Sequence, residues 1–294
     1  MNVAAMGSRR ALRMACSLTA AAAALLILTS GASAFNFTTI DVPGAIETSA
    51  RAINAKGQIV GRFTDASKVV HGFLLDGGVF TTIDAPGATQ TRARGINRQG
   101  QIVGFYQDAS KHTHGFLLDQ GVFTTIDAPG STNTRPHMIT GAGKIVGLYV
   151  DGANVQHGFL LVAGVFTTID FPGATSTGAQ ARRKSRIIGN YEDTSNVQRG
   201  FLMDKKGNFS TIVYPGATFT ELHSMNGHLQ IVGSYRVSKG PLHGFTLDQP
   251  SATFATVDFP GAATTEINGV SAKGVIVGEY TDSSGQLHGF IATP

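Results

Sequence analysis

A motif of about 43 residues occurs six times in this chain at regular spacing, and it limits the folds that the chain can adopt more than any other feature of the sequence. Pro-Gly recurs at spacings of 43, 43, 43, 43 and 45 residues. Two further landmarks keep the same phase: a run of Ile/Val-Val/Ile-Gly, and His-Gly-Phe, in which Arg199 replaces the histidine of the fourth copy. The prolines are Pro43, Pro86, Pro129, Pro172, Pro215 and Pro260. Three landmarks in phase indicate a repeat architecture.

Each repeat has the pattern of four short strands. In the second copy these are residues 92–97, 101–107, 114–119 and 122–127, separated by turn residues and followed by Pro129, which cannot donate to a strand ladder. Four strands in about 40 to 45 residues is the period of a propeller blade. The sequence therefore predicts one all-β domain over residues 35–294, a six-bladed β-propeller with four antiparallel strands per blade.

The order of strands also predicts how the blades close. Residues 37–41 have the pattern of the fourth strand of a repeat, and residues 288–292 have that of the third. If the first strand completes the last blade, every blade has four strands and the ring is closed. An open stack would leave two apolar end faces without the polar caps that repeat arrays need.

Residues 1–34 have the order of a secretory signal peptide. Arg9, Arg10 and Arg13 precede an apolar run over residues 15–28, and a small-residue cleavage motif ends at Ala34. The apolar run has 14 residues, fewer than the roughly 18 to 20 that cross a bilayer. We therefore expect a secreted protein, periplasmic or extracellular, without a membrane span. The one cysteine, Cys16, lies in this leader, so the mature chain is expected to lack disulfides and thiolate metal sites.

The charge balance gives no support to a nucleic-acid partner. The formal charge of +4 includes three arginines and no acidic residue from the leader, so it falls to +1 without residues 1–34. The 37 glycines, among 294 residues, also argue against a long-helix or coiled-coil protein. We expect a monomer without metal or cofactor.

The repeated motifs resemble those of the HAF-repeat family of bacterial exported repeat proteins. The resemblance covers residues 35–294 and rests on Gly95-Ile96-Asn97, Gln101-Ile102-Val103-Gly104 and His114-Gly115-Phe116, with their equivalents in the other copies. The family is named for the tripeptide His-Ala-Phe, and this chain has glycine in place of that alanine. The resemblance implies an extracellular or envelope location and a repeat fold, but it implies no particular reaction.

A binding site is expected where the copies differ, because the shared residues build the scaffold. Three residues after the threonine that opens each first strand lies a hydrogen-bonding side chain. These are Arg51, Arg94, His137, Gln180, His223 and Asn268. Two positions earlier lie Ser49, Arg92, Arg135, Gly178, Glu221 and Glu266.

Period-2 alternation predicts that both sets face one channel as a polar funnel, cationic near the first three repeats and acidic near the last two. Such a funnel could hold an anionic or polyhydroxylated ligand, since arginine forks suit carboxylate and sulfate. Alternatively, the side chains only line a water-filled channel. Glu221 and Glu266 are the one acid/base pair that the sequence offers.

Three other groups have simpler interpretations. The five repeated histidines are expected to satisfy buried backbone groups, and the aspartates before the Pro-Gly turns to cap those turns. His112 and His114 lie two apart, but no third ligand recurs beside them in sequence. The cationic run over residues 182–186 could bind a polyanion. We favour the interpretation that it is a solvated turn in a repeat that has lost one residue.

The sequence thus favours an exported, non-enzymatic binding or scaffold propeller. Its partner would be a small anionic or carbohydrate ligand, or an extracellular macromolecule. One alternative is a channel-centred lyase or hydrolase acting on a carbohydrate-like substrate, with His137 or His223 as base and Arg94 and Arg135 stabilising negative charge. Another is a structural surface protein without a small ligand.

Overall fold

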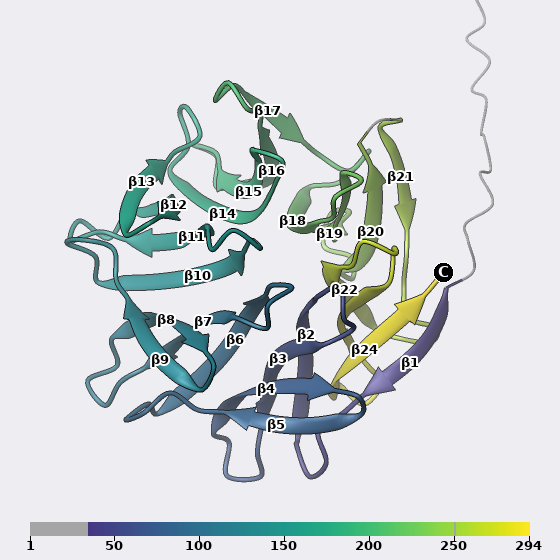
Figure 1. The fold of residues 1–294 in the computed structure, drawn as a ribbon. Coiled ribbons are helices and arrows are strands. Elements are labelled where there is room, and N and C mark those ends of the chain that lie inside the picture. The colour runs from purple at the N-terminus through teal and green to yellow at the C-terminus, as the bar shows by residue number, and fades with distance from the viewer. Residues whose placement is uncertain (1–34, 250) are drawn as a thin grey trace, which may run out of the picture. The chain divides into compact units, whose positions relative to one another are not determined.

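The computed structural model describes residues 35–249 and 251–294, and these form 24 β-strands arranged around a central axis (Figure 1). The expected signal peptide, residues 1–34, lies outside the described residues. No helix in the described part of the chain meets the length and hydropathy that a membrane-spanning helix needs.

The strands follow the six sequence repeats. The first repeat forms β2 (Glu47–Ile53), β3 (Ile59–Thr64), β4 (Val70–Asp76) and β5 (Val79–Ile83). The second forms β6 (Gln90–Ile96), β7 (Ile102–Gln107), β8 (Thr113–Asp119) and β9 (Val122–Ile126), and the third forms β10 (Asn133–Ile139), β11 (Ile145–Val150), β12 (Gln156–Val162) and β13 (Val165–Ile169). The fourth forms β14 (Ser176–Arg183), β15 (Arg186–Glu192), β16 (Gln198–Met203) and β17 (Phe209–Ile212). The fifth forms β18 (Phe219–Met225), β19 (Gln230–Arg236), β20 (His243–Asp248) and β21 (Thr253–Thr256). The last repeat forms β22 (Thr264–Val270), β23 (Ile276–Thr281) and β24 (Leu287–Thr293). One further strand, β1 (Asn36–Ile40), comes before the first repeat.

Hydrogen bonding groups these strands into four four-stranded sheets and one eight-stranded sheet. The eight-stranded sheet contains the second and third repeats, which one parallel bridge between Asn133 and Thr113 joins. The sequence predicted separate sheets here. Gly115 permits this approach of β10 to β8, because a Cβ there would lie 2.6 Å from the Pro136 ring.

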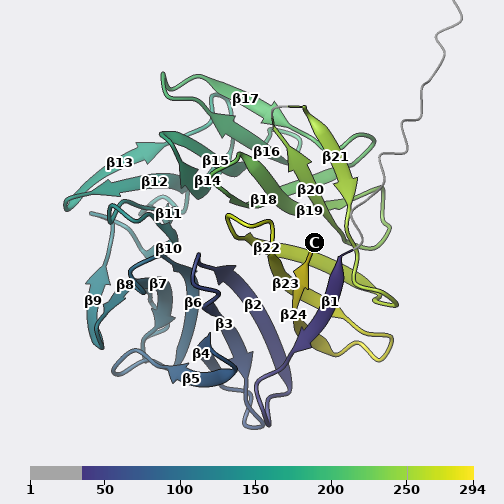
Figure 2. The ribbon, with the colours of Figure 1, turned by 45° about the vertical axis from the view of Figure 1, so that its right-hand side comes forward.

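The first described strand completes the sheet of the last repeat. β1 pairs antiparallel with β24 over five residue pairs, from Asn36 opposite Thr293 to Ile40 opposite Gly289. The two strands lie side by side in each view (Figures 1 and 2). This pairing, which joins the two ends of the described chain, is the one that the order of strand patterns predicted.

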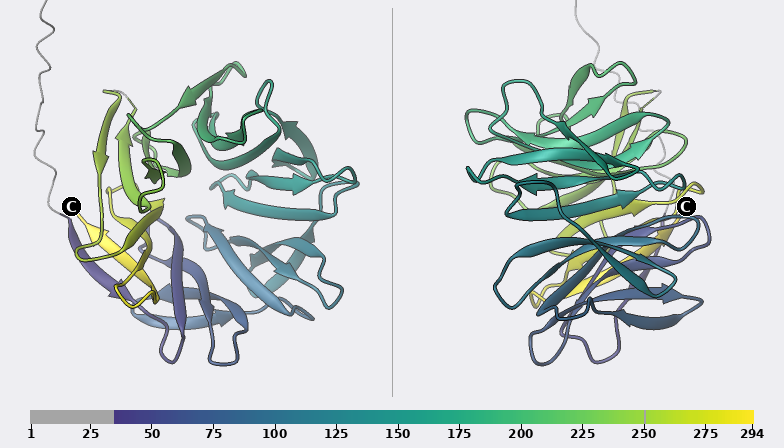
Figure 3. Two further views of the ribbon diagram at one scale, coloured as in Figure 1. Left: turned by 180° about the vertical axis from the view of Figure 1, so that it is seen from behind. Right: turned by 60° about the vertical axis from the view of Figure 1, so that its left-hand side comes forward.

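The core lies between neighbouring sheets, which stand face to face around the axis (Figure 3). Each cluster combines residues of consecutive repeats and contains one fully buried phenylalanine from a His-Gly-Phe or Arg-Gly-Phe tripeptide. The cluster at Phe73 joins the last repeat to the first, because Ile40 of β1 and Val277 of β23 pack there. The six phenylalanines are Phe73, Phe116, Phe159, Phe201, Phe245 and Phe290.

Glycine is required where strands meet these rings. A Cβ on Gly104 would lie 2.1 Å from the carbonyl oxygen of Arg92 and 2.9 Å from the Phe116 ring. Phe116 belongs to the same repeat as Gly104. At Gly115 the close neighbour, Pro136, lies in the next repeat.

The repeated threonines hold the Pro-Gly turns. In every repeat the threonine hydroxyl accepts a hydrogen bond from the backbone N–H of the residue that precedes the proline, as Thr91 does from Ala85 at 3.0 Å. The side chain therefore satisfies a donor at the point where one sheet ends and the next begins.

The repeated histidines bind the aspartates of the Pro-Gly turns, which differs from both roles expected from the sequence. Nδ1 of His114 lies 2.8 Å from Asp127, and Nδ1 of His157 lies 3.0 Å from Asp170. A carboxylate can only accept, so Nδ1 carries the proton. The hydrogen bond to Asp127 raises the pKa of His114. At His157 burial lowers the pKa, but Asp170 and Asp151 together outweigh it, so the pKa is raised there as well. These side chains are thus paired with each other rather than with backbone groups.

Matched substitutions test the junction between the last and first repeats. Ile40 and Ile83 hold equivalent positions and are both buried, Ile40 between the last and first repeats and Ile83 between the first and second. We expect Ile40→Ala and Ile83→Ala each to lower the free energy of unfolding by about 2 to 5 kcal/mol. Chemical denaturation measures both, and a cost at Ile40 below a quarter of that at Ile83 would show that the junction does not form.

The histidine pairs predict a pH dependence of stability. Because the folded pKa of His114 and His157 is raised, their stabilisation is complete below the unfolded pKa of about 6.5 and is lost as pH rises through the folded pKa. The double variant His114→Gln, His157→Gln should therefore lose less stability than the parent protein between pH 6 and pH 8.5. Urea denaturation at the two pH values measures this difference. Equal losses would contradict it, and Arg199→Gln, at the position that carries no histidine, is the control.

Candidate functional site

Every innermost strand carries a β-bulge, and the bulged residue is the variable one singled out in the sequence. The ladder between β6 and β7 pairs Ala93 with Gly104 and then Gly95 with Val103, so Arg94 has no partner opposite it. The same shift skips one residue in each of the other five inner strands. The six residues are Arg51, Arg94, His137, Gln180, His223 and Asn268. A bulge re-aims a side chain, which here turns each one toward the axis.

These six side chains line one cavity, as the sequence predicted, and it is narrow. Its volume is about 40 Å³, which is room for a few water molecules. We call this space the neck. It is lined in addition by Arg183 from the end of β14. A sugar ring does not fit in the neck, so these residues alone cannot hold the ligand that the sequence predicted.

Three of the bulged side chains link one repeat to the next. Each donates to the backbone carbonyl that precedes the next repeat's bulge: Nδ1 of His137 to Ala179 at 3.1 Å, and Nδ1 of His223 to Ile267 at 2.9 Å. Nδ2 of Asn268 donates to the carbonyl of Ala50 at 3.1 Å. The bulges leave these carbonyls free, so the three side chains satisfy buried acceptors.

Arg51 is fully neutralised. Its guanidinium donates to Glu266 at 3.3 Å, to Asn268 at 3.1 Å and to both oxygens of Glu279 at 3.2 and 3.3 Å. Burial alone lowers the pKa of Arg51, but the carboxylates of Glu279 and Glu266 raise it above its ordinary value. Sequence reasoning missed Glu279. The sequence feature that could have identified Glu279 is that no other repeat has a carboxylate at this position. The equivalent residues are Arg62, Phe105, Leu148, Asn190 and Ser234.

The two histidines of the neck have opposite charge preferences. Burial and the nearby Arg94 cation hold the pKa of His137 well below its usual range, so this ring is neutral at pH 7. Burial also acts on His223, but the carboxylates of Glu221 and Glu266 raise its pKa, and Nε2 lies 3.5 Å from Glu221. His137 therefore offers an acceptor at Nε2, whereas the carboxylates beside His223 favour its protonated form.

Arg94 is a cation of the neck without a direct partner. It makes no hydrogen bond or ion pair within residues 35–249 and 251–294. Burial lowers its pKa to about 9, the Arg51 charge lowers it further, and the carboxylates of Glu266, Glu221 and Glu279 partly offset these effects. The guanidinium is still charged at neutral pH, and no carboxylate lies within ion-pair distance of it among the described residues.

The second set of predicted residues does not line the neck, so the single funnel was wrong, although Glu266 accepts a hydrogen bond from Arg51 and Glu221 lies 3.5 Å from His223. Arg92 and Arg135 line a separate cleft with a volume of about 90 Å³. Gly178 and Glu221 line another of about 200 Å³, and Ser49 is fully buried. The bulge is the physical reason, because an extra residue in each strand breaks the period-2 alternation on which the funnel rested.

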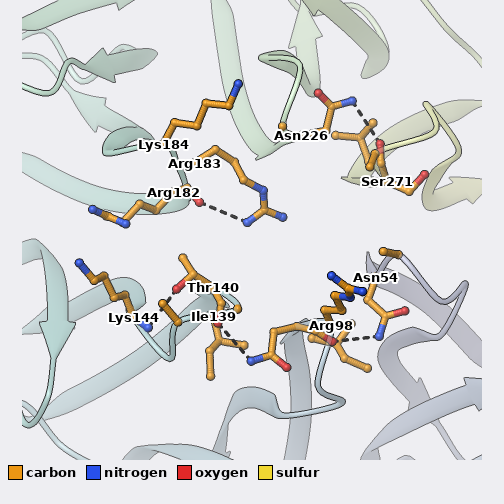
Figure 4. Close-up of a pocket in the computed structure, with 18 of the residues that line it drawn as sticks. Asn54, Arg98, Ile139, Thr140, Lys144, Arg182, Arg183, Lys184, Asn226 and Ser271 are labelled. Atoms are coloured by element: carbon orange, nitrogen blue, oxygen red, sulfur yellow. Dashed lines mark hydrogen bonds between the residues drawn. The ribbon is translucent and has the colours of Figure 1, made fainter.

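The neck opens into a wide pocket at the turns that follow the innermost strands (Figure 4). This pocket, which we call the mouth, has a volume of about 460 Å³ and shares Ile53, Ile96, Arg183 and Val270 with the neck. Its lining contains no aspartate or glutamate. Its cations are Arg98, Lys144, Arg182, Arg183 and Lys184.

The fourth repeat supplies three of the five mouth cations. Its shortened turn places Lys184 and Ser185 at φ angles of 47° and 64°, the left-handed region that a two-residue type I′ hairpin requires. Arg182 pairs with Ile187 at the position where other repeats have apolar residues such as Ile96. Arg183 is half-buried, and burial lowers its pKa. The cationic run is therefore part of a pocket rather than the freely solvated turn that we favoured from the sequence.

Comparison with known proteins places the fold. TolB from Acinetobacter baumannii superimposes with a TM-score of 0.59 at 11% identity, and the alignment covers 80% of this chain and 63% of TolB. The Aleuria aurantia lectin, described as a six-bladed β-propeller, gives a TM-score of 0.53 at 14% identity, covering 86% of this chain and 93% of the lectin. The chain is an all-β propeller. The SapL1 lectin, solved with α-methyl fucoside, agrees with a TM-score of 0.56 at 12% identity, covering 80% of this chain and 88% of that one.

No protein-family model and no curated protein sequence matches the chain. At these identities the structural likeness concerns the propeller fold alone. The chain spans less than two thirds of the TolB chain, 63%. The function of this propeller has to be argued from its own pockets.

The bulge linkages predict a difference between two residues of the neck. Asn268→Ala leaves the buried carbonyl of Ala50 without a donor and removes an acceptor from Arg51, so we expect a loss of about 1 to 3 kcal/mol in the free energy of unfolding. Gln180→Ala removes a side chain for which the described residues provide no hydrogen bond, and we expect a change within about 0.5 kcal/mol. Urea denaturation of the two variants measures both. Equal costs would show that the neck side chains do not link the repeats.

Proposed function

We propose that residues 35–294 form a closed propeller of six blades. The six sequence repeats support this count, with the eight-stranded sheet taken as two blades that one bridge joins. The pairing of β1 with β24 and the packing of Ile40 against Phe73 support closure. A closed ring fixes the inner strands around one axis, which a site built from every repeat requires.

We further propose that this propeller is a binding module and that its ligand is anionic and sits in the mouth. One observation carries the proposal: a pocket of about 460 Å³ in which five cations meet no carboxylate. Like charges gathered around a cavity repel one another, and an anion relieves that repulsion. The volume lies within the range of ordinary small-molecule sites.

The neck gives the ligand a direction. Arg183 lines both spaces, and Arg94 lies below it without a carboxylate partner. A single anionic group, such as a carboxylate, is small enough to approach these two guanidiniums, while the body of the ligand remains in the mouth. The polar rim of the mouth, which includes Thr140 and Ser271, suits hydroxyl groups on that body. A sugar acid or a sulfated or phosphorylated sugar combines both features.

The structural likeness to lectins supports a carbohydrate-like ligand only through analogy of fold. The Aleuria aurantia lectin and SapL1 were solved with fucosides. Their likeness to this chain adds support to a binding role for the propeller, whereas the cationic lining is the reason for expecting negative charge on the ligand here.

The enzymatic alternative has less support. His137 and His223, its candidate bases, lie in a neck of about 40 Å³ and each donates from Nδ1 to a backbone carbonyl. A substrate in the mouth would have to reach Nε2 of His137 through the neck. A structural role without a small ligand does not explain why unpaired cations gather in the mouth.

Export of the propeller and membership of the HAF-repeat family remain part of the proposal. Both rest on the sequence: export on the signal-peptide order of residues 1–34, and the family on the motifs around Gly95, Gly104 and Gly115. An anion-binding propeller outside the cytoplasm would meet uronic acids, sulfated glycans and other charged polymers.

Removing two mouth cations should weaken anion binding. We expect an anionic probe, a uronic-acid oligomer or a heparin-type glycan, to bind the purified protein, and Arg98→Gln with Lys184→Asn to reduce its affinity at least tenfold because two charge-assisted contacts are lost. Asparagine tolerates the positive φ of Lys184. Isothermal titration calorimetry measures the affinity, with a neutral glucan as the uncharged comparison.

The matched control removes two lysines of the outer loops. Lys68 and Lys111 are also exposed and have positive φ angles of 65° and 67°, so Lys68→Asn with Lys111→Asn makes the same kind of change away from the mouth. This control should bind like the parent protein. Equal weakening in both double variants would mean only non-specific attraction, and no binding of any anionic probe would refute the proposal.

A further inference from the structure

We infer that the propeller has a second anion site, separate from the mouth, in the cleft between the second and third repeats where Arg92 and Arg135 face Phe105. The cleft has a volume of about 90 Å³ and is lined by Gln90, Arg92, Phe105, Gln107, Thr113 and Arg135. It shares no lining residue with the mouth or the neck. Arg92 lies near the start of β6, whereas the mouth lies beyond the end of that strand.

Neutral groups hold both arginines in place. Arg92 donates from a terminal nitrogen to Oε1 of Gln90 at 3.3 Å, and Arg135 donates from Nε to Oδ1 of Asn133 at 3.0 Å. Both guanidiniums also lie over the ring of Phe105, with Cζ at 5.7 and 5.3 Å from its centroid. These contacts orient the two cations, but they leave their charges uncompensated.

The cleft lacks the carboxylate that such a pair normally has. No aspartate or glutamate lines it, and neither arginine takes part in an ion pair within the described residues. The pKa of each is lowered, first by burial, and for Arg92 also by the charges of Arg62 and Arg135. Glu47, the acidic group that acts on Arg92, pairs with Arg62 instead. Two like charges thus remain side by side in a half-enclosed space.

The donors of the two arginines point to the same conclusion. Nε of Arg92 is buried and has no hydrogen-bond partner, so the protein alone does not satisfy this guanidinium. Within the described residues, Arg92 makes one side-chain hydrogen bond, to Gln90, and Arg135 makes one, to Asn133, which leaves terminal N–H groups of both for an oxyanion. Thr113 also lines the cleft and adds a hydroxyl group.

The size of the cleft selects the ligand. A volume of about 90 Å³ holds one compact oxyanion, a sulfate or a carboxylate, but not a sugar ring in addition. Two arginine forks recognise either group through paired N–H donors. We therefore assign the cleft to a single sulfate or carboxylate group, either as the free ion or carried by a larger molecule that remains outside.

Inorganic sulfate and acetate are the probes for this site. The purified protein is titrated with each salt at constant ionic strength, with chloride as the balancing ion, and the arginine Nε–H resonances and the melting temperature are followed. We expect saturable shifts of the Arg92 and Arg135 resonances. Arg92→Gln with Arg135→Gln should weaken binding of the probe at the cleft at least tenfold. If sulfate saturates and acetate does not, the site prefers a tetrahedral group, and the reverse result assigns a carboxylate.

The mouth variant separates this inference from the proposed function. Arg98→Gln with Lys184→Asn should leave the shifts at Arg92 and Arg135 unchanged, because those residues lie outside the cleft. If the cleft double variant does not fold, Arg135→Lys keeps the charge, loses the fork and should still weaken binding. Shifts that follow ionic strength alone, or a rise in melting temperature with the probe that is as large in the cleft variant as in the parent protein, would overturn the inference without touching the mouth.

Discussion

The bulge in each innermost strand is the interaction on which the rest of this propeller depends. One unpaired residue per repeat turns a side chain toward the axis and frees the carbonyl that precedes it. His137, His223 and Asn268 use the freed carbonyl of the next repeat as an acceptor. The same distortion thus lines the neck and ties one repeat to the next. A regular strand would present its side chains alternately to the two neighbouring blades and leave the axis without polar groups.

Charge compensation divides the axis into two parts. Around Arg51, the carboxylates of Glu266 and Glu279 neutralise the guanidinium, and Glu221 pairs with His223. In the neighbouring repeat, Arg94 lines the neck without an ion pair among the described residues, and the same carboxylates act on it only at longer range. A buried cation is costly unless a carboxylate or a ligand compensates it. The paired cation Arg51 and the unpaired cation Arg94 thus differ in what they leave open to a ligand, although both belong to one ring of bulged residues.

The sequence predicted the architecture because its information is repeated. Six in-phase copies indicated the strand pattern and the pairing of β1 with β24, and the variable position of each copy identified the six bulged residues that line the neck. It could not predict the bulge, since two residues opposite one leave no mark in the strand pattern. That is why Arg92 and Arg135 were assigned to the wrong cavity. Sequence reasoning also missed Glu279, although the carboxylate is unusual among the copies, because its role follows only from its contact with Arg51 where the first and last repeats meet.

The mouth shows how one altered copy can give a repetitive scaffold a specific surface. The fourth repeat has lost one residue of its turn, so two residues other than glycine, Lys184 and Ser185, adopt positive φ, a conformation that costs free energy. Arg182 stands where other copies place an apolar side chain, and Arg183 stands where the first two copies place an asparagine, Asn54 and Asn97, that bonds to the following repeat. A linkage between repeats and an unstrained turn are both absent at this point, and three cations are present instead. The third and sixth copies also lack the asparagine, with Thr140 and Ser271 at this position, but only the fourth copy combines its loss with a shortened turn and with cations that line the mouth.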